Sequence, residues 1–152
     1  WPHTAKIWVD PFVRNSNVKH LMTWTNDINP EYEADYNMEA LDFLKLIDDE
    51  SVDGVLFDPP YSVRQIKECY EGIGRTVTQY DTQNPWTAYK KEIARIVKPE
   101  GKVIRFGWTS GGIGKKLGFE LVEVMLVPHG GVRNDTIVTV EHKRLEKQEK
   151  LF

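Results

Sequence analysis

The chain of 152 residues contains 40% hydrophobic and 28% charged side chains, a balance that predicts one soluble globular domain. Twenty basic and twenty-three acidic residues give a net charge of -3, which excludes a polycationic nucleic-acid binder and requires any such partner to meet a local patch. The single cysteine, Cys69, excludes an intrachain disulfide, and no Cys/His cluster has the spacing of a zinc site, so we expect no metal. Without a long apolar run or a signal peptide, the sequence predicts an intracellular, cytoplasmic protein that contacts no membrane.

Short apolar runs alternate with segments of helical periodicity along the first two thirds of the chain, and polar or Pro/Gly residues separate them. This alternation is typical of an α/β domain with a mostly parallel sheet. The expected strands cover residues 5 to 9, 20 to 25, 34 to 37 (a weak candidate), 54 to 57 and 102 to 106. The expected helices cover residues 39 to 46, 63 to 70 and 86 to 97.

The last third of the chain has a different pattern. Two β-rich runs at residues 119 to 127 and 135 to 142 flank the turn-forming segment 128 to 134, which predicts an antiparallel hairpin. The segment Lys98-Pro99-Glu100-Gly101 predicts a turn that ends the preceding helix. We therefore expect a mostly parallel seven-stranded sheet that ends in an antiparallel hairpin and carries helices on both faces.

An apolar strand runs into an acid, two prolines and an aromatic residue at Asp58-Pro59-Pro60-Tyr61. In an open parallel sheet, ligands bind at the carboxyl ends of the strands. Consecutive prolines fix the backbone and carry carbonyl oxygens without an N–H, so this loop presents acceptors in a set direction. A planar ring would stack on Tyr61 while its exocyclic amine donates to Asp58 and the Pro59 carbonyl. The motif therefore predicts a site for an adenine held by its amino group.

The same four residues resemble the catalytic motif of the S-adenosylmethionine-dependent amino-methyltransferases, in particular the adenine-N6 DNA methyltransferases. The resemblance implies one Rossmann-like class I methyltransferase domain over residues 1 to 152, without a separate target-recognition domain. It also implies direct methyl transfer to adenine in DNA, with Asp58 as the proton acceptor, Pro59 and Pro60 as the rigid carbonyl loop and Tyr61 as the stacking platform. Cytosine-N4 enzymes of this family more often have serine at the first position, so the aspartate favours adenine.

The upstream segment Ile7-Trp8-Val9-Asp10-Pro11-Phe12 resembles the cofactor motif of this family. The resemblance implies that Asp10, Pro11 and Phe12 bind S-adenosylmethionine, with Phe12 against its methionine part. The family continues into a glycine-rich turn, which allows close approach of the backbone to the ligand. This chain lacks those glycines, so we expect Asn15 or Asn17 to adopt the left-handed conformation there.

Two further acids match positions that bind the cofactor in the family, and Asp58 borders the cofactor as well. Asp27, before Pro30, resembles the acid that binds the ribose hydroxyls, although a helix cap or an Asx turn is the structural alternative. Glu39 resembles the acid beside the adenine amine of the cofactor. Its competitor is Asp35, and an acid placed at a helix start is the structural alternative.

Four residues downstream of the motif are candidates for nucleic-acid binding: Arg64, Arg75, Tyr80 and Trp86. Aromatic side chains interleaved with a base suit stacking on an extruded or single-stranded nucleotide. They border the long segment 72 to 85, which predicts either a substrate-responsive loop or an ordinary surface loop. Trp86 is equally suited to anchor its helix in the core. The basic residues expected near the mouth of the site are Arg64, Lys67, Arg75, Lys90, Lys91, Lys115, Lys116 and Arg133. A solvated face is the alternative for Lys90 and Lys91. Trp108 follows the fifth strand and is also expected at the ligand edge.

Several alternatives stay open at this stage. RNA is the main rival substrate, and methylation of cytosine N4 in DNA is a second one. The missing glycines after Phe12 favour a non-catalytic subunit with a degenerate methyltransferase fold. Target recognition is expected from a partner subunit, a second copy of the chain or short loops, because only helices and a loop separate Tyr61 from the fifth strand.

Overall fold

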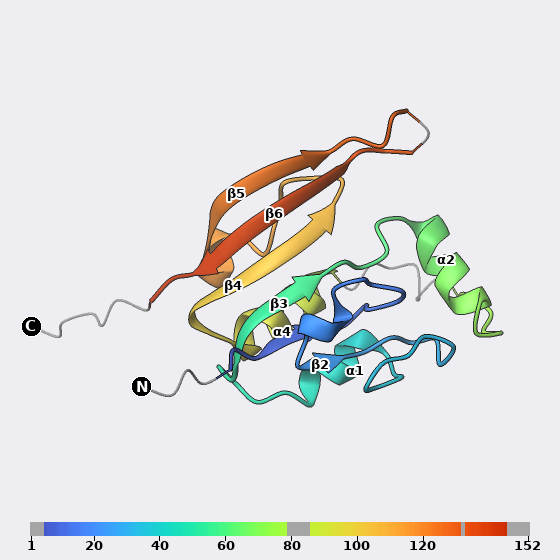
Figure 1. Ribbon diagram of the computed structural model, residues 1–152, viewed down its shortest axis with the longest axis horizontal. Coiled ribbons are helices and arrows are strands. Elements are labelled where there is room, and N and C mark those ends of the chain that lie inside the picture. Colours follow the sequence, from blue (N-terminus) through green and yellow to red (C-terminus); the bar gives the residue numbers. More distant parts are fainter. Residues whose placement is uncertain (1–4, 79–85, 132, 146–152) are drawn as a thin grey trace, which may run out of the picture.

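A computed structural model describes residues 5–78, 86–131 and 133–145, in which six strands form one sheet of order β2-β1-β3-β4-β6-β5 (Figure 1). The strands are β1 (Trp8–Asp10), β2 (Trp24–Thr25), β3 (Val52–Phe57), β4 (Val97–Gly107), β5 (Phe119–Val127) and β6 (Thr136–Lys143). The helices are α1 (Ala40–Lys45), α2 (Val63–Glu71) and α4 (Trp86–Ile96), with short 3-10 turns η1 (Lys19–Leu21) and η2 (Lys115–Leu117).

The sheet is mixed and has fewer strands than the sequence predicts. Strands β2, β1, β3 and β4 run parallel to one another, whereas β6 and β5 are antiparallel. The weak candidate at residues 34 to 37 forms only an isolated parallel bridge between Tyr36 and Asn26, so the described residues contain six strands and not seven. The predicted closing hairpin is confirmed.

Local sequence explains most of the element boundaries. Ser62 caps α2, because its hydroxyl accepts a hydrogen bond from the backbone N of Gln65 at 3.2 Å. The Lys98 to Gly101 turn lies inside the bounds of β4, where the register against β3 slips and Glu100 has a φ of 64°. The prediction for residues 20 to 25 was wrong in its first half, since η1 occupies that part and β2 contains only two residues.

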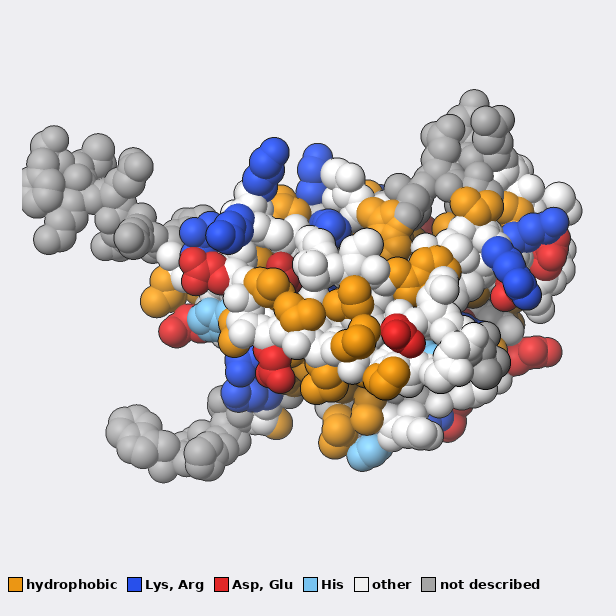
Figure 2. Space-filling view, turned by 90° about the horizontal axis from the view of Figure 1, so that it is seen from above, with side chains coloured by type: hydrophobic (Ala, Val, Ile, Leu, Met, Phe, Trp, Pro, Cys, Tyr) orange, Lys and Arg blue, Asp and Glu red, His pale blue; other side chains and the backbone are white. Residues whose placement is uncertain are grey.

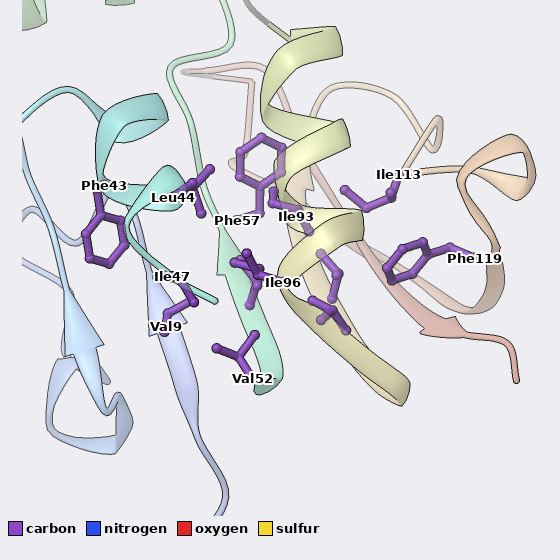
Figure 3. Packing of buried hydrophobic residues seen from close by; sticks show 13 residues of the cluster. Val9, Phe43, Leu44, Ile47, Val52, Phe57, Ile93, Ile96, Ile113 and Phe119 are labelled. Atoms are coloured by element: carbon purple, nitrogen blue, oxygen red, sulfur yellow. The ribbon is translucent and has the colours of Figure 1, made fainter. Parts of the chain in front are cut away.

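The hydrophobic core lies between the sheet and one layer of helices (Figure 3). Phe43 and Leu44 of α1 and Ile93 and Ile96 of α4 pack against Phe57 of β3 and its neighbours, all of them almost fully buried. Helix α2 instead lies beyond the carboxyl end of β3 (Figure 1). The sequence pattern indicated helices on both faces of the sheet, but the described α-helices do not cover both faces. None of them has the length and apolar composition of a membrane-spanning segment.

Strand β5 forms one edge of the sheet, and its apolar side chains are largely exposed. Figure 2 shows hydrophobic side chains gathered across the middle of the molecule when it is seen from above. The exposed apolar residues of β5 are Leu121, Val122, Val124, Met125 and Leu126. A long apolar edge strand is unusual on a protein surface, since its free backbone groups can pair with another chain. The sheet is thus open on the side opposite to β1 and β2.

Candidate active site

The carboxyl ends of β1, β3 and β4 bring polar side chains to one edge of the sheet. Asp10 ends β1, Asp58 follows β3 and Arg105 lies near the end of β4. The parallel pairings of β1 with β3 and of β3 with β4 place these three ends side by side. The segments Asp10-Pro11-Phe12 and Asp58-Pro59-Pro60-Tyr61 therefore lie at the same edge of the sheet. In the described part of the chain, no three His, Cys, Asp or Glu side chains gather as metal ligands would.

The four residues of the catalytic motif form a fixed loop after β3. The Tyr61 hydroxyl donates a short hydrogen bond to Oδ1 of Asp58, and the backbone N of Tyr61 donates to the Gln65 side chain. Pro59 is buried and Pro60 is partly buried. Among the described residues, neither the second carboxylate oxygen of Asp58 nor the Pro59 carbonyl has a hydrogen-bond partner. The second Asp58 oxygen and the Pro59 carbonyl can therefore each accept one hydrogen bond from an amine that carries two N–H groups.

The pKa values of Asp58 and Tyr61 are both raised, although part of Asp58 is exposed to solvent. Burial raises the pKa of Asp58, while the hydrogen bond from Tyr61 and the charge of Arg14 oppose that rise. Burial, and then the negative charge of Asp58, also raise the pKa of Tyr61, so its hydroxyl stays protonated. A carboxylate with a raised pKa is a better proton acceptor, and the neutral Tyr61 hydroxyl holds it in place.

The segment from Asp10 to Phe12 is held tightly against the sheet. Asp10 is 1% exposed, and its Oδ1 accepts the backbone N–H of Phe12 at 2.9 Å. Burial raises the pKa of Asp10 to about 7; the Phe12 hydrogen bond opposes this, and the charges of Asp58 and Asp27 add to it. The Pro11 carbonyl accepts a hydrogen bond from the Asn26 side chain at 3.1 Å.

The Phe12 ring packs onto two aromatic neighbours. Its centroid lies 6.0 Å from that of Phe57 and 5.5 Å from that of Tyr89, in tilted and edge-on arrangements. Phe12 is partly buried and adjoins the core on this side. The rings of Phe57 and Tyr89 therefore fix the position of the Phe12 ring. The contact of Phe12 with the methionine part of the cofactor stays a prediction.

The turn after Phe12 departs from the expected conformation. Arg14 has a φ of 41°, and neither Asn15 nor Asn17 has a positive φ, so the prediction for those two residues was wrong. The Arg14 backbone N donates to Oδ2 of Asp27 at 3.0 Å, and its guanidinium lies 5.9 Å from the centroid of the Tyr32 ring. These contacts hold a left-handed residue at the place where the family has glycine.

The two further acids are bound by the protein itself. Asp27 is 6% exposed, and its two oxygens accept the backbone N–H groups of Arg14 and Asn29, the second forming an Asx turn. The carboxylate of Glu39 accepts the Tyr70 hydroxyl at 2.9 Å and Arg75 Nη1 at 2.8 Å. The Asx alternative for Asp27 is thus confirmed, while the cofactor roles of Asp27 and Glu39 stay predictions.

Asp35, the competitor of Glu39, is engaged with β2. Its Oδ2 accepts the backbone N of Thr25 at 2.8 Å and the Thr25 hydroxyl at 2.9 Å. The Thr25 hydroxyl in turn accepts the backbone N of Asp35. This reciprocal pair anchors the segment that bridges to β2, which favours a structural role for Asp35.

The four candidates for nucleic-acid binding are found in different places. Arg64 is exposed and pairs with Glu68 on α2, and Arg75 pairs with Glu39. Trp86 packs edge-on against Phe57 and belongs partly to the core, as its structural alternative predicts. Tyr80 lies outside the described residues.

A pocket of about 290 Å³ opens beside the catalytic motif. It is lined by Tyr61, Trp86, Lys90, Arg105, Trp108 and Thr109. The rings of Tyr61 and Trp108 lie 5.8 Å apart, and the volume is at the lower end of small-molecule sites. Sequence reasoning missed Arg105, although a lone arginine within the apolar run Val103-Ile104-Arg105-Phe106 is a signal that a charge enters the structure.

Comparison with known proteins identifies the fold. No protein-family model matches the sequence, and no curated protein sequence does either. TrmN from Thermus thermophilus aligns with a TM-score of 0.59 at 16% identity, over 91% of this chain and 44% of that chain. A SAM-dependent methyltransferase from Methanosarcina mazei aligns with a TM-score of 0.59 at 10% identity, over 94% and 95%.

A third structure, the 1,6-didemethyltoxoflavin-N1-methyltransferase of Burkholderia thailandensis, holds 1,6-didemethyltoxoflavin and S-adenosylhomocysteine. It aligns with a TM-score of 0.59 at 11% identity, over 91% of this chain and 71% of that chain. This chain therefore has the fold of the S-adenosylmethionine-dependent methyltransferases. It spans less than half the length of TrmN.

Proposed function

We propose that this protein transfers a methyl group from S-adenosylmethionine to the N6 amine of adenine in DNA. The observation that carries the proposal is the loop after β3, where one oxygen of Asp58 and the Pro59 carbonyl have no hydrogen-bond partner among the described residues and Tyr61 contacts Asp58. An exocyclic amine has two N–H groups and a ring to stack, which matches this arrangement. The fold shared with S-adenosylmethionine-dependent methyltransferases supports the same chemistry.

The residues at the ends of β1 and β2 fit the proposed cofactor. A buried carboxylate such as Asp10 suits a ligand that carries a positive sulfonium, because the opposite charge offsets the cost of burying an ionised acid. Phe12 would adjoin the methionine part, Asp27 the ribose and Glu39 the adenine amine. The contacts that Asp27 and Glu39 already make would have to be shared with or exchanged for the ligand.

S-adenosylmethionine supplies an electrophilic methyl group when it is bound. Asp58 and the Pro59 carbonyl accept hydrogen bonds from the amine and orient its lone pair away from the ring. Methylation leaves the amine positively charged, and Asp58 would accept the proton that the amine then loses and pass it to solvent. The Tyr61 hydroxyl fixes the carboxylate during these steps. The products are N6-methyladenine and S-adenosylhomocysteine.

A second candidate function is a non-catalytic subunit with the same fold. The contacts of Glu39 with Tyr70 and Arg75, and the left-handed Arg14 in place of glycine, favour it because both restrict the cofactor side. A partner subunit or a second copy that supplies target recognition is compatible with either function. The exposed apolar strand β5 supports such an association.

The test is methyl transfer from isotope-labelled S-adenosylmethionine to duplex DNA, single-stranded DNA and RNA in parallel, followed by nucleoside digestion and mass spectrometry. We expect N6-methyladenine from DNA. Label in RNA alone would show that the substrate is RNA and not DNA. N4-methylcytosine among the products would show that the methylated base is cytosine and not adenine. No label, combined with no cofactor binding in a separate titration, would establish the non-catalytic candidate.

A further inference from the structure

Arg105 is a buried cation at the ligand edge. The residue is 6% exposed, its Cζ lies 5.4 Å from the centroid of the Trp86 ring, and Nη1 donates to the Thr109 carbonyl at 2.8 Å. Within the described part of the chain no carboxylate forms an ion pair with it, and its Nε has no hydrogen-bond partner. A buried charge is unstable unless an opposite charge or hydrogen bonds compensate it, so this guanidinium is incompletely compensated.

No described residue on the side of β6 supplies the missing hydrogen-bond partner. Glu141 attracts Arg105 through space, but its two oxygens accept the backbone N–H groups of Ile113 and Gly114. Thr139, which lies directly opposite Arg105 in the β4–β6 register, is fully buried, and its hydroxyl also lacks a partner among the described residues. Among the described residues, the two buried side-chain atoms that lack a hydrogen-bond partner thus belong to residues that face each other across β4 and β6.

A second cation lines the same pocket. Lys90 of α4 is partly buried there, and burial, followed by the charge of Arg105, lowers its pKa. Two cations that share one pocket repel each other, and an anion bound between them removes that repulsion. The remaining lining is mostly aromatic, with Tyr61, Trp86 and Trp108. Such rings suit the sugar and base of a nucleotide.

We propose that Arg105 and Lys90 bind a phosphate group of the substrate, beside the base that Asp58 and Tyr61 hold. The planar guanidinium matches two phosphate oxygens, and Lys90 adds a point charge. The proposal rests on the proposed function, because it takes the adjoining loop as the base site, and it defines the substrate class as a nucleotide. The phosphate belongs either to a polynucleotide backbone or to a free mononucleotide.

The experiment is isothermal titration of the whole chain with adenosine, 5′-AMP, 3′-AMP and a single-stranded oligodeoxynucleotide that contains one adenine. We expect the oligonucleotide, and also AMP if a terminal phosphate suffices, to bind at least about 10-fold more tightly than adenosine, as a charge-assisted hydrogen bond gives. Arg105→Gln should remove this preference and leave adenosine affinity unchanged. It should also lower the slope of log affinity against log salt for the oligonucleotide by about 1. Preference for the oligonucleotide alone identifies the backbone as the source, and equal preference for AMP identifies a terminal phosphate.

Matched variants keep the test decisive. Lys91 is exposed on α4 beside Lys90, so Lys91→Gln removes the same charge and should preserve the phosphate preference. Lys90→Gln should reduce the phosphate preference about three-fold or more. This variant replaces Arg105→Gln in the test if thermal melting shows that Arg105→Gln does not fold. Equal affinity of wild type for adenosine and all its phosphates would overturn the proposal. Because binding is measured without methyl transfer, a phosphate preference without N6-methyladenine would refute the proposed function while leaving this pocket assigned.

Discussion

The two halves of the ligand edge differ in how far the protein uses its own polar groups. On the cofactor half, Asp27 accepts two backbone N–H groups, and Glu39 accepts a hydroxyl and a guanidinium from the region of α2. On the substrate half, one oxygen of Asp58, the Pro59 carbonyl and Arg105 Nε have no partner among the described residues. Under the proposed roles, the substrate half gains hydrogen bonds when a ligand binds, whereas Asp27 and Glu39 on the cofactor half have to exchange protein contacts for ligand contacts.

This comparison assigns different costs to the two binding steps. A site whose acceptors are unpartnered gains hydrogen bonds when a ligand arrives, and little of the protein has to move. A site whose acceptors are already used gains only the difference between the new bonds and the old ones. We therefore expect substitutions on the substrate half to remove activity, and substitutions on the cofactor half to shift affinity in either direction.

The largest effect is expected from Asp58→Asn. The amide cannot take the proton of the amine, so the rate of transfer should fall by at least about 100-fold, while the affinity for S-adenosylmethionine changes little. Single-turnover transfer and cofactor titration measure the two quantities. Transfer by the variant at a rate near that of wild type would mean that Asp58 is not the proton acceptor.

The second prediction sets two variants on the cofactor half against each other. If the cofactor adenine uses Glu39, then Glu39→Gln should weaken cofactor binding about 10-fold, because a hydrogen bond to a charged acceptor is lost. Arg75→Gln should strengthen binding by about two- to five-fold, because it removes a competitor whose partly exposed ion pair is weak. Both affinities come from the same titration. Changes of the same sign in the two variants would exclude competition at Glu39.

The third prediction concerns pH. Because the pKa of Asp10 is about 7, this carboxyl is mostly protonated at pH 6 and mostly ionised at pH 8. The affinity for the positively charged S-adenosylmethionine should therefore rise by up to about 10-fold between those values. The affinity for S-adenosylhomocysteine, which lacks the sulfonium charge, should change much less. If the affinities for the two ligands depend on pH in the same way, Asp10 does not contact the sulfonium of the cofactor.

Asp10→Asn provides the control and a test on stability. Because the pKa of Asp10 is raised from 3.8 to about 7 on folding, the protonated side chain contributes to the free energy of unfolding. This contribution is complete below pH 3.8 and is lost as the pH rises through about 7. The variant should therefore gain stability relative to wild type at pH 8, by on the order of 1–4 kcal/mol, and show little gain at pH 4. Thermal melting across this pH range measures the gain. A gain that does not depend on pH would contradict the burial of an ionising group.

The smallest effect is expected from Arg14→Gly. Glycine tolerates a φ of 41° without strain, so the free energy of unfolding should rise by about 0.5–1 kcal/mol, less what the contact with Tyr32 contributes. Chemical denaturation is the measurement, and cofactor affinity is measured alongside. Asn15→Gly is the control, since Asn15 has no positive φ and should gain nothing. Destabilisation by Arg14→Gly larger than that by Asn15→Gly would show that Arg14 is held by its contacts and not strained.

The parts of the fold that local sequence controls are the parts that it predicts well. The expected bounds of β5 agree with the structure because a strongly β-forming run lies between a glycine and a turn-rich segment. The start of α2 follows from its Ser62 cap. The run from Gly54 to Phe57 before Asp58 is predicted as a strand because it is apolar, as buried parallel strands are, and β3 extends it by Val52 and Asp53.

Other parts depend on contacts between residues that are far apart in the sequence. The bond between Glu39 and Arg75 joins residues 36 positions apart, which no local pattern reveals. Arg14, and not an asparagine, adopts the left-handed conformation, because its backbone N–H donates to the Asp27 carboxylate and its guanidinium lies over the Tyr32 ring. Arg105 escaped notice since its neighbours in the strand read as core, and only the β4–β6 register shows that it is buried beside Thr139.

The most direct test of the adenine assignment uses three single-stranded oligonucleotides that differ at one position in an otherwise all-thymine sequence. One carries adenine as its only exocyclic amine, the second carries cytosine instead, and the third carries purine, which has no amine. With labelled S-adenosylmethionine, the account predicts label in the adenine oligonucleotide alone, and its loss with Asp58→Asn. Label in the purine oligonucleotide, or more label in cytosine than in adenine, would contradict the assignment of the loop after β3 as an adenine-amine site.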